Sequence, residues 1–120
     1  MIEGRLFAAM LMPAAATAGC GPAIHPSFDS PEPAARNAAI VRATAASDAA
    51  SVPDLVRMLR SDDPATRLLA ITSLRRMTGE TFGYDYGAPP GERDAAIARW
   101  ERHIAERSSA APAAGMGAGA

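Results

Sequence analysis

Hydrophobic and polar positions follow a helical period between residues 51 and 79. In the first half of this stretch, four hydrophobic residues have the spacing i, i+3, i+4 and i+7 of one helix face: Val52, Leu55, Val56 and Leu59. After a short acidic turn, a similar stripe comprises Ala70, Ile71, Leu74 and Met77. The pattern predicts a hairpin of two α-helices, each with one face to bury.

Residues suited to helix ends flank both stripes. Pro53 falls in the first turn of the first predicted helix, where a missing backbone N–H costs nothing. Asp63 and Pro64 suit the N-cap and first positions of the second helix, and Gly79 suits its C-cap. Arg67 lies one helical turn after Asp63, so we expect an ion pair between them worth about 0.2–0.5 kcal/mol.

The same stretch resembles a HEAT-type helical repeat of the kind found in bacterial proteins. The matching residues are Pro53-x-Leu55-x-x-Met58-Leu59, then Asp63-Pro64-x-x-Arg67, and then Ala70, Ile71 and Leu74. The sequence departs from the family pattern at Thr66, where a branched aliphatic residue usually precedes the arginine, and at the apolar pair Leu68-Leu69. The resemblance implies a short α-solenoid, a fold whose usual role is extended contact with other proteins.

Part of this pattern occurs a second time, 31 residues earlier in the chain. The two aligned segments are Ser30-x-Glu32-Pro33-Ala34-x-Arg36-x-x-Ala39-Ile40 and Ser61-x-Asp63-Pro64-Ala65-x-Arg67-x-x-Ala70-Ile71. Such an offset is typical of solenoid proteins. Alanine is abundant in this chain, so the proline, arginine and isoleucine matches have the most weight. We predict that residues 33–46 form the second helix of an earlier, degenerate unit.

A last helix is predicted over residues 90–107. Its apolar stripe comprises Ala96, Ile97, Trp100 and Ile104, and its other face is charged, as the end of a solenoid requires. We expect Trp100 to lie in the core and His103 to border the stripe. The whole pattern predicts an all-α fold of about four helices over residues 33–107.

Three aromatic residues occur in the Gly- and Pro-rich segment before that helix: Phe82, Tyr84 and Tyr86. Glycine and proline favour a loop here. The loop either folds back over the end of the core or exposes an aromatic patch that binds a partner. The resemblance favours the first interpretation, because a Thr-Gly-x-x-Phe-Gly-Tyr segment precedes a final Trp-containing helix in many bacterial HEAT-repeat proteins.

The two ends of the chain have compositions unlike the helical region. Residues 1–20 resemble a bacterial lipoprotein signal in which Cys20 is lipidated, although Thr17 stands where leucine is usual. An ordinary secretory signal or a buried N-terminal helix are the alternatives. Residues 21–32 are Pro-rich and predict a tether, and the Ala/Gly-rich residues 108–120 predict a disordered tail.

Composition narrows the candidate chemistry. The net charge of −1 does not favour a nucleic-acid partner. Neither histidine lies in a catalytic motif, and the only cysteine lies in the signal segment. No EF-hand spacing or phosphate-binding loop follows from the pattern. We therefore expect no enzyme activity, no cofactor and no metal site.

These observations favour a scaffold or protein-binding module anchored to the cell-envelope membrane by lipid on Cys20, or else secreted or periplasmic. Candidate contacts with the unknown protein partner are Arg57, Arg60, Arg75, Arg76, Tyr84 and Tyr86. The alternatives are a degenerate fragment of a larger repeat protein or a lyase-like accessory protein. So few repeats predict marginal stability, aided by a partner or by self-association.

Overall fold

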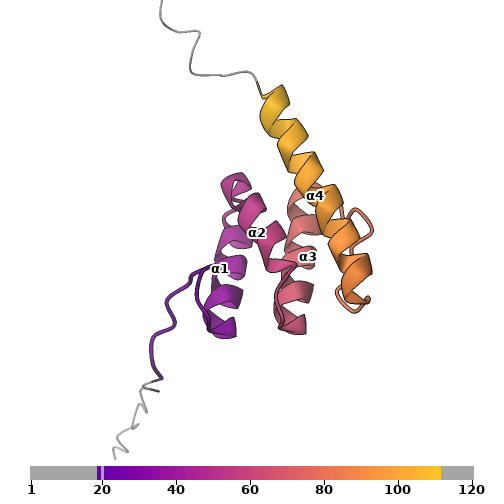
Figure 1. The fold of residues 1–120 in the computed structure, drawn as a ribbon. Coiled ribbons are helices and arrows are strands. Elements are labelled where there is room, and N and C mark those ends of the chain that lie inside the picture. The colour runs from indigo at the N-terminus through magenta and orange to yellow at the C-terminus, as the bar shows by residue number, and fades with distance from the viewer. Residues whose placement is uncertain (1–18, 20, 112–120) are drawn as a thin grey trace, which may run out of the picture.

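The computed structural model describes Gly19 and residues 21–111, and over these residues it is helical and contains no strand (Figure 1). The elements in chain order are α1 (Pro33–Ala45), the short 3₁₀-helix η1 (Ala49–Ser51), α2 (Val52–Met58), α3 (Pro64–Thr78) and α4 (Pro90–Ala110). The prediction of an all-α fold with four α-helices is therefore confirmed for the part of the chain that is described.

Helix α3 packs against both α1 and α2, and α2 also contacts α4. Figure 1 shows α1 and α3 on either side of the short α2, with the C-terminal turns of α4 projecting beyond the other helices. The two helices of the predicted hairpin are thus α2 and α3, joined by the acidic turn. Their neighbours α1 and α4 cover the apolar surface that the hairpin leaves open.

The core is formed by the hydrophobic stripes that the sequence pattern predicts. Its fully buried large side chains come from all four helices: Ile40, Leu55, Leu59, Leu74, Ile97 and Trp100. Val52, Met77 and Ile104 are only partly buried at the edge of this cluster. Burying one large apolar side chain stabilises a fold by about 1.5–3 kcal/mol, so these few residues account for much of the stability.

The predicted ends of α3 are confirmed in detail. The Asp63 carboxylate accepts hydrogen bonds from the backbone N–H groups of Ala65 (3.3 Å) and Thr66 (3.1 Å), and Pro64 is the first helical residue. Gly79 ends the helix in the left-handed conformation, with φ = 81°. That φ favours glycine because a Cβ atom would be strained there.

The predicted Pro-rich tether is shorter than residues 21–32, because its last residues pack against the domain. The Ser27 N–H donates to the Ala35 carbonyl oxygen (3.1 Å), and the Phe28 side chain lies against the core. The sequence contains prolines that exclude regular structure here, but proline does not prevent an irregular segment from packing. The folded part of the chain therefore begins at about Ser27, before its first helix.

The predicted C-terminal boundary at Arg107 also shifts, because α4 continues to Ala110. The Ser109 hydroxyl donates to the Ala105 carbonyl oxygen (2.7 Å), so the predicted disordered tail begins too early by three residues. The predicted signal segment with Cys20, and the predicted tail from residue 112 onward, lie outside the described residues. Among the helices that are described, none combines the length and apolar character needed to span a membrane.

Candidate functional site

The turn before α3 is held by a buried arginine. Arg67 Nη1 donates to the carbonyl oxygens of Ser61 (2.9 Å) and Asp62 (3.0 Å). The predicted ion pair of Arg67 with Asp63 is wrong, because the guanidinium reaches past Asp63 to the preceding carbonyl groups. The Asp63 carboxylate instead caps the helix. Arg67 therefore fixes the path of the chain into α3.

The turn before α1 is built in the same way. Arg36 Nη1 donates to the carbonyl oxygens of Ser30 (3.0 Å) and Pro31 (2.9 Å). The Ser30 hydroxyl accepts from the Glu32 N–H (3.1 Å) as the Ser61 hydroxyl accepts from the Asp63 N–H (3.2 Å). The two turns thus share these arginine and serine hydrogen bonds, whereas only the second has a side-chain cap, at Asp63.

Each of these arginines also contacts a turn or loop further along the chain. Arg36 Nη2 lies 3.5 Å from the Ser61 hydroxyl and 3.7 Å from Asp62 Oδ1. Arg67 Nε donates to the Tyr86 carbonyl oxygen (3.2 Å). The two guanidinium groups therefore link the first turn to the second turn, and the second turn to the loop before α4.

Thr66, where the sequence departs from the HEAT-repeat pattern that it resembles, is fully buried, and its hydroxyl group makes polar contacts. Its hydroxyl oxygen lies 2.8 Å from Asn37 Oδ1 and 2.7 Å from Asp63 Oδ2. A hydroxyl donates one hydrogen, so both contacts are satisfied if it donates to Asp63 and the Asn37 amide turns its NH₂ group toward it. The hydrogen bond from Thr66 lowers the pKa of Asp63, and backbone N–H groups add to this effect. Thr66 thus links α1 to the cap of α3.

The aromatic loop folds over the end of the core, as the first of the two interpretations predicts. Tyr84 is only 6% exposed, and its hydroxyl donates to the Leu59 carbonyl oxygen (2.7 Å). The Phe82 ring packs edge-to-face on Trp100, with ring centroids 4.7 Å apart. Trp100 Nε1 donates to the Thr81 carbonyl oxygen (3.1 Å). The prediction of Tyr84 as a surface contact is therefore wrong, because its ring fills the core.

Burial raises the pKa of Tyr84, because the phenolate would be poorly solvated there. Tyr86, two residues later, is 40% exposed and remains available on the surface. Of the two tyrosines of the loop, one therefore lies in the core and one is in contact with solvent.

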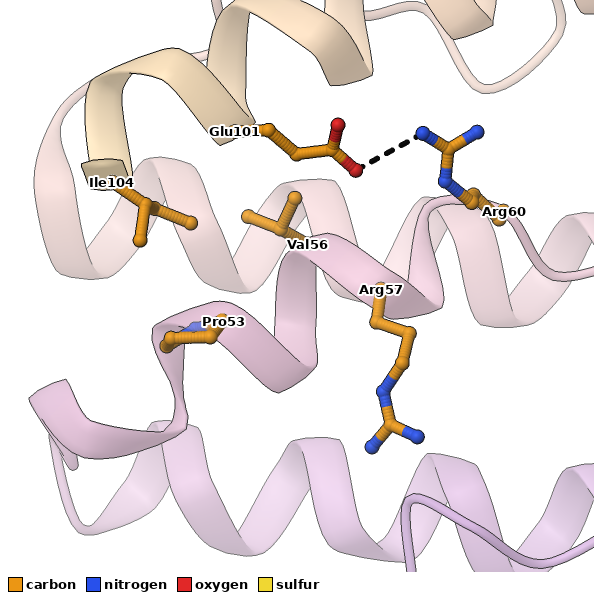
Figure 2. A pocket seen from close by; sticks show the side chains of 6 residues that line it. All are labelled: Pro53, Val56, Arg57, Arg60, Glu101 and Ile104. Atoms are coloured by element: carbon orange, nitrogen blue, oxygen red, sulfur yellow. Dashed lines mark hydrogen bonds and ion pairs between the residues drawn. The ribbon is translucent and has the colours of Figure 1, made fainter. Parts of the chain in front are cut away.

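A groove lies between α2 and α4, with a volume of about 490 Å³. We call it the α2–α4 groove, and it is lined by Pro53, Val56, Arg57, Arg60, Glu101 and Ile104 (Figure 2). Figure 2 shows the Arg60 guanidinium facing the Glu101 carboxylate across the groove, whereas Arg57 points away from them. The structure thus brings two of the predicted contact residues to one groove.

Both arginines of this groove are paired with carboxylates of the same chain. Arg60 lies 3.0 Å from Glu101 and 3.4 Å from Asp94. Arg57 pairs with Asp29 and with Asp54, and the hydrogen bonds that it donates to these carboxylates raise its pKa. Two arginines therefore face four carboxylates, so the α2–α4 groove offers a partner little unbalanced positive charge.

A second hollow of about 600 Å³ adjoins the first. We call it the C-terminal cavity, because it lies among the ends of α1 and α3 and the last turns of α4. Its lining residues are Thr44, Ser47, Ala49, Val52, Pro53, Arg76, Met77, Thr78, Trp100, His103, Ile104, Arg107, Ser108 and Ala111. Pro53 and Ile104 line both hollows, so the two adjoin at these residues.

The two remaining predicted contacts, Arg75 and Arg76, lie in the last turn of α3 and are exposed. Of these two arginines, only Arg76 lines the C-terminal cavity. Arg107 and His103 of α4 line it as well, and the sequence alone did not suggest them as contacts. Their place in this lining depends on how α4 lies relative to α2 and α3, for which no local sequence signal exists.

Among the described residues, no three or more histidine, cysteine, aspartate or glutamate side chains gather where they could hold a metal ion. Arginines and apolar side chains line both hollows, and residues with hydroxyl groups line the C-terminal cavity as well, which suits noncovalent binding. No protein-family model, curated protein or solved structure matches the chain.

Proposed function

We propose that this chain is a non-enzymatic helical-repeat module that binds another protein. The observation that supports the proposal best is the pair of equivalent turns at Arg36 and Arg67, which have the same hydrogen bonds 31 residues apart. Equivalent units at such a spacing are typical of helical-repeat proteins. Stacked helical units form extended surfaces that these proteins use to bind partners.

The two adjoining hollows beside α4 supply a surface for such a partner. They are lined by partly buried apolar side chains, which include Val52, Met77 and Ile104. Apolar area with adjacent arginines is the composition found at the centre of protein interfaces. We assign the exposed groups of these hollows a role in binding and orienting the partner protein, and no role in making or breaking bonds.

We further propose that the module is tethered to the cell-envelope membrane through lipid on Cys20. The resemblance of residues 1–20 to a lipoprotein signal supports this assignment. Metabolic labelling with an acyl chain tests it, with Cys20→Ser as the control. Label that is absent, or that survives the substitution, would remove the anchor from the proposal without touching the binding function.

The binding function is tested by the size of the complex that contains the chain in its own host, extracted in mild detergent at its natural abundance. We expect native mass spectrometry to show a defined assembly with one other protein. Ile104→Gln, at the junction of the two hollows, should dissociate it. Arg102→Ala, at an exposed position of the same helix, should leave the assembly intact.

A chain that is recovered only as a free monomer would contradict the proposed function. Thermal melting of both variants shows whether Ile104→Gln remains folded, which must be checked because Ile104 is partly buried. If Ile104→Gln stays folded and the assembly persists, the partner binds elsewhere on the surface.

A further inference from the structure

The C-terminal cavity differs from the α2–α4 groove in its charge. Its lining contains Arg76, Arg107 and His103 and includes no aspartate or glutamate. Neither Arg76 nor Arg107 forms an ion pair within residues 21–111, and both are exposed. Asp48 lies in sequence between the lining residues Ser47 and Ala49, but its carboxylate already accepts a hydrogen bond from the Ser51 hydroxyl (2.6 Å). The positive charge of the cavity is therefore unbalanced.

The wall of the cavity is apolar beneath these charges. Val52, Met77 and Ile104 are partly buried there, and they pack against the hydrophobic core cluster, to which the fully buried Trp100 belongs. Hydroxyl groups of Thr44, Ser47, Thr78 and Ser108 lie among its other lining residues. Such a hollow suits a ligand with an apolar part to bury and an anionic part to place at the rim.

We propose that the C-terminal cavity binds an acidic peptide segment of the partner protein, with an apolar side chain in the hollow and carboxylates beside Arg76 and Arg107. The proposal rests on the proposed protein-binding function and names the chemistry of the partner and the face that it uses. Arginine forms two parallel hydrogen bonds with a carboxylate, which gives the contact direction as well as charge.

The shape of the cavity favours a peptide over the other anionic partners. A concave hollow of about 600 Å³ can enclose a side chain of a peptide, whereas a bilayer surface is flat and needs a projecting basic patch. A nucleic-acid partner requires a longer basic stripe, and the net charge of this chain is −1. Charge and concavity together therefore indicate an acidic, partly apolar segment.

The experiment is selection of displayed random peptides on the full chain, followed by affinity measurement of the selected peptides by fluorescence anisotropy. We expect enriched sequences to contain aspartate or glutamate beside a large apolar residue. Arg76→Gln with Arg107→Gln should weaken their binding about tenfold or more, which corresponds to 1.4 kcal/mol per factor of ten. Rising salt should weaken binding as well.

The matched control is Arg75→Gln with Arg102→Gln. It removes the same charge from the same two helices at exposed positions that do not line the cavity. This control should bind the selected peptides as the unsubstituted chain does. Equal loss in both double variants would show a general charge effect and overturn the proposal.

Other outcomes also decide the question. Selection of neutral or basic peptides, or of none, would overturn the proposed ligand class, as would preferential binding to vesicles of anionic lipid that Arg76→Gln with Arg107→Gln abolishes. A chain that forms a defined assembly in its host but selects no acidic peptide retains the proposed function and loses this inference. A chain that is monomeric in its host and selects no peptide loses both.

Discussion

Arg36 and Arg67 occupy equivalent places 31 residues apart, and each donates to two carbonyl oxygens of the turn that precedes its helix. Each arginine also contacts a segment further along the chain. Arg36 contacts the Ser61 hydroxyl of the turn before α3, and Arg67 donates to the Tyr86 carbonyl oxygen of the loop before α4. A guanidinium group has five N–H donors in a fixed plane, so one side chain can satisfy several backbone acceptors. This relationship joins two helical units and the following loop into one body.

The first prediction concerns this arginine geometry. Arg67→Lys keeps the charge but loses the planar fork, so at least one partly buried carbonyl oxygen loses its partner. Hydrogen bonds to charged groups are worth about 1.5–3 kcal/mol, and we expect the free energy of unfolding to fall by a value in that range. Denaturant unfolding followed by circular dichroism measures the change.

Arg42→Lys is the control for this prediction, because Arg42 is an exposed arginine of α1. Exposed substitutions of this kind usually change the free energy of unfolding by less than about 0.5 kcal/mol. Equal effects of Arg67→Lys and Arg42→Lys would mean that the fork of Arg67 does not hold the turn.

The second prediction concerns Trp100, which is fully buried, contacts Phe82 and donates to the Thr81 carbonyl oxygen. Trp100→Ala should lower the free energy of unfolding by about 3–5 kcal/mol. That is a large part of the roughly 5–15 kcal/mol available to a small domain, so the far-ultraviolet circular dichroism should show partial or complete unfolding at 25 °C. A nearly unchanged unfolding midpoint would place this side chain on the surface.

The third prediction concerns the alkaline pH dependence. Burial raises the pKa of Tyr84 in the folded chain, so the folded state favours the neutral phenol. The corresponding stability is fully present below the unfolded pKa of about 10 and is lost as the pH rises through the higher folded value. In the Tyr86→Phe background, which leaves Tyr84 as the only tyrosine, tyrosinate absorbance should appear late and together with unfolding.

The Tyr84→Phe variant separates the two contributions of this side chain. At neutral pH it should lose about 0.5–1.5 kcal/mol, because the hydrogen bond to the Leu59 carbonyl oxygen disappears. Its stability should fall less between neutral and alkaline pH than that of the parent chain. An identical alkaline decline in both proteins would show that Tyr84 is not the group responsible.

The fourth prediction concerns acid. Hydrogen bonds from Thr66 and from the backbone lower the pKa of Asp63, so its charged form is favoured in the folded chain. This contribution is present above the unfolded pKa of about 4 and is lost as the pH falls through the lower folded value. The melting temperature of Asp63→Asn, which can still cap the helix, should depend less on pH in this range. Parallel curves for the two proteins would contradict this role.

The fold could be predicted well wherever the signal is local. The helical stripe through Leu55 and Leu59 and the caps at Asp63 and Gly79 follow from the spacing and the side-chain chemistry of adjacent residues. Trp100 follows in the same way, as the largest apolar residue of an amphipathic helix. These features need no knowledge of which segments meet in space.

The features that could not be predicted depend on distant segments. Helix spacing alone suggests that Arg67 pairs with Asp63. In the structure Arg67 instead donates to the carbonyl oxygens of Ser61 and Asp62, because the path of the turn brings these oxygens within its reach. The opposite fates of Tyr84 and Tyr86 depend on the path of an irregular loop. The C-terminal cavity likewise exists only because residues of α1, α3 and α4, which are distant in sequence, line one hollow.

The most direct test of a partner-binding face is site-specific photo-crosslinking of the full chain in its host. A photoreactive residue replaces either Ile104, which lines both hollows, or Arg102, which lies about 200° around the same helix. We predict one discrete covalent adduct with another protein from position 104 and none from position 102. No adduct from position 104 in the folded chain, or equal adducts from both positions, would contradict the account.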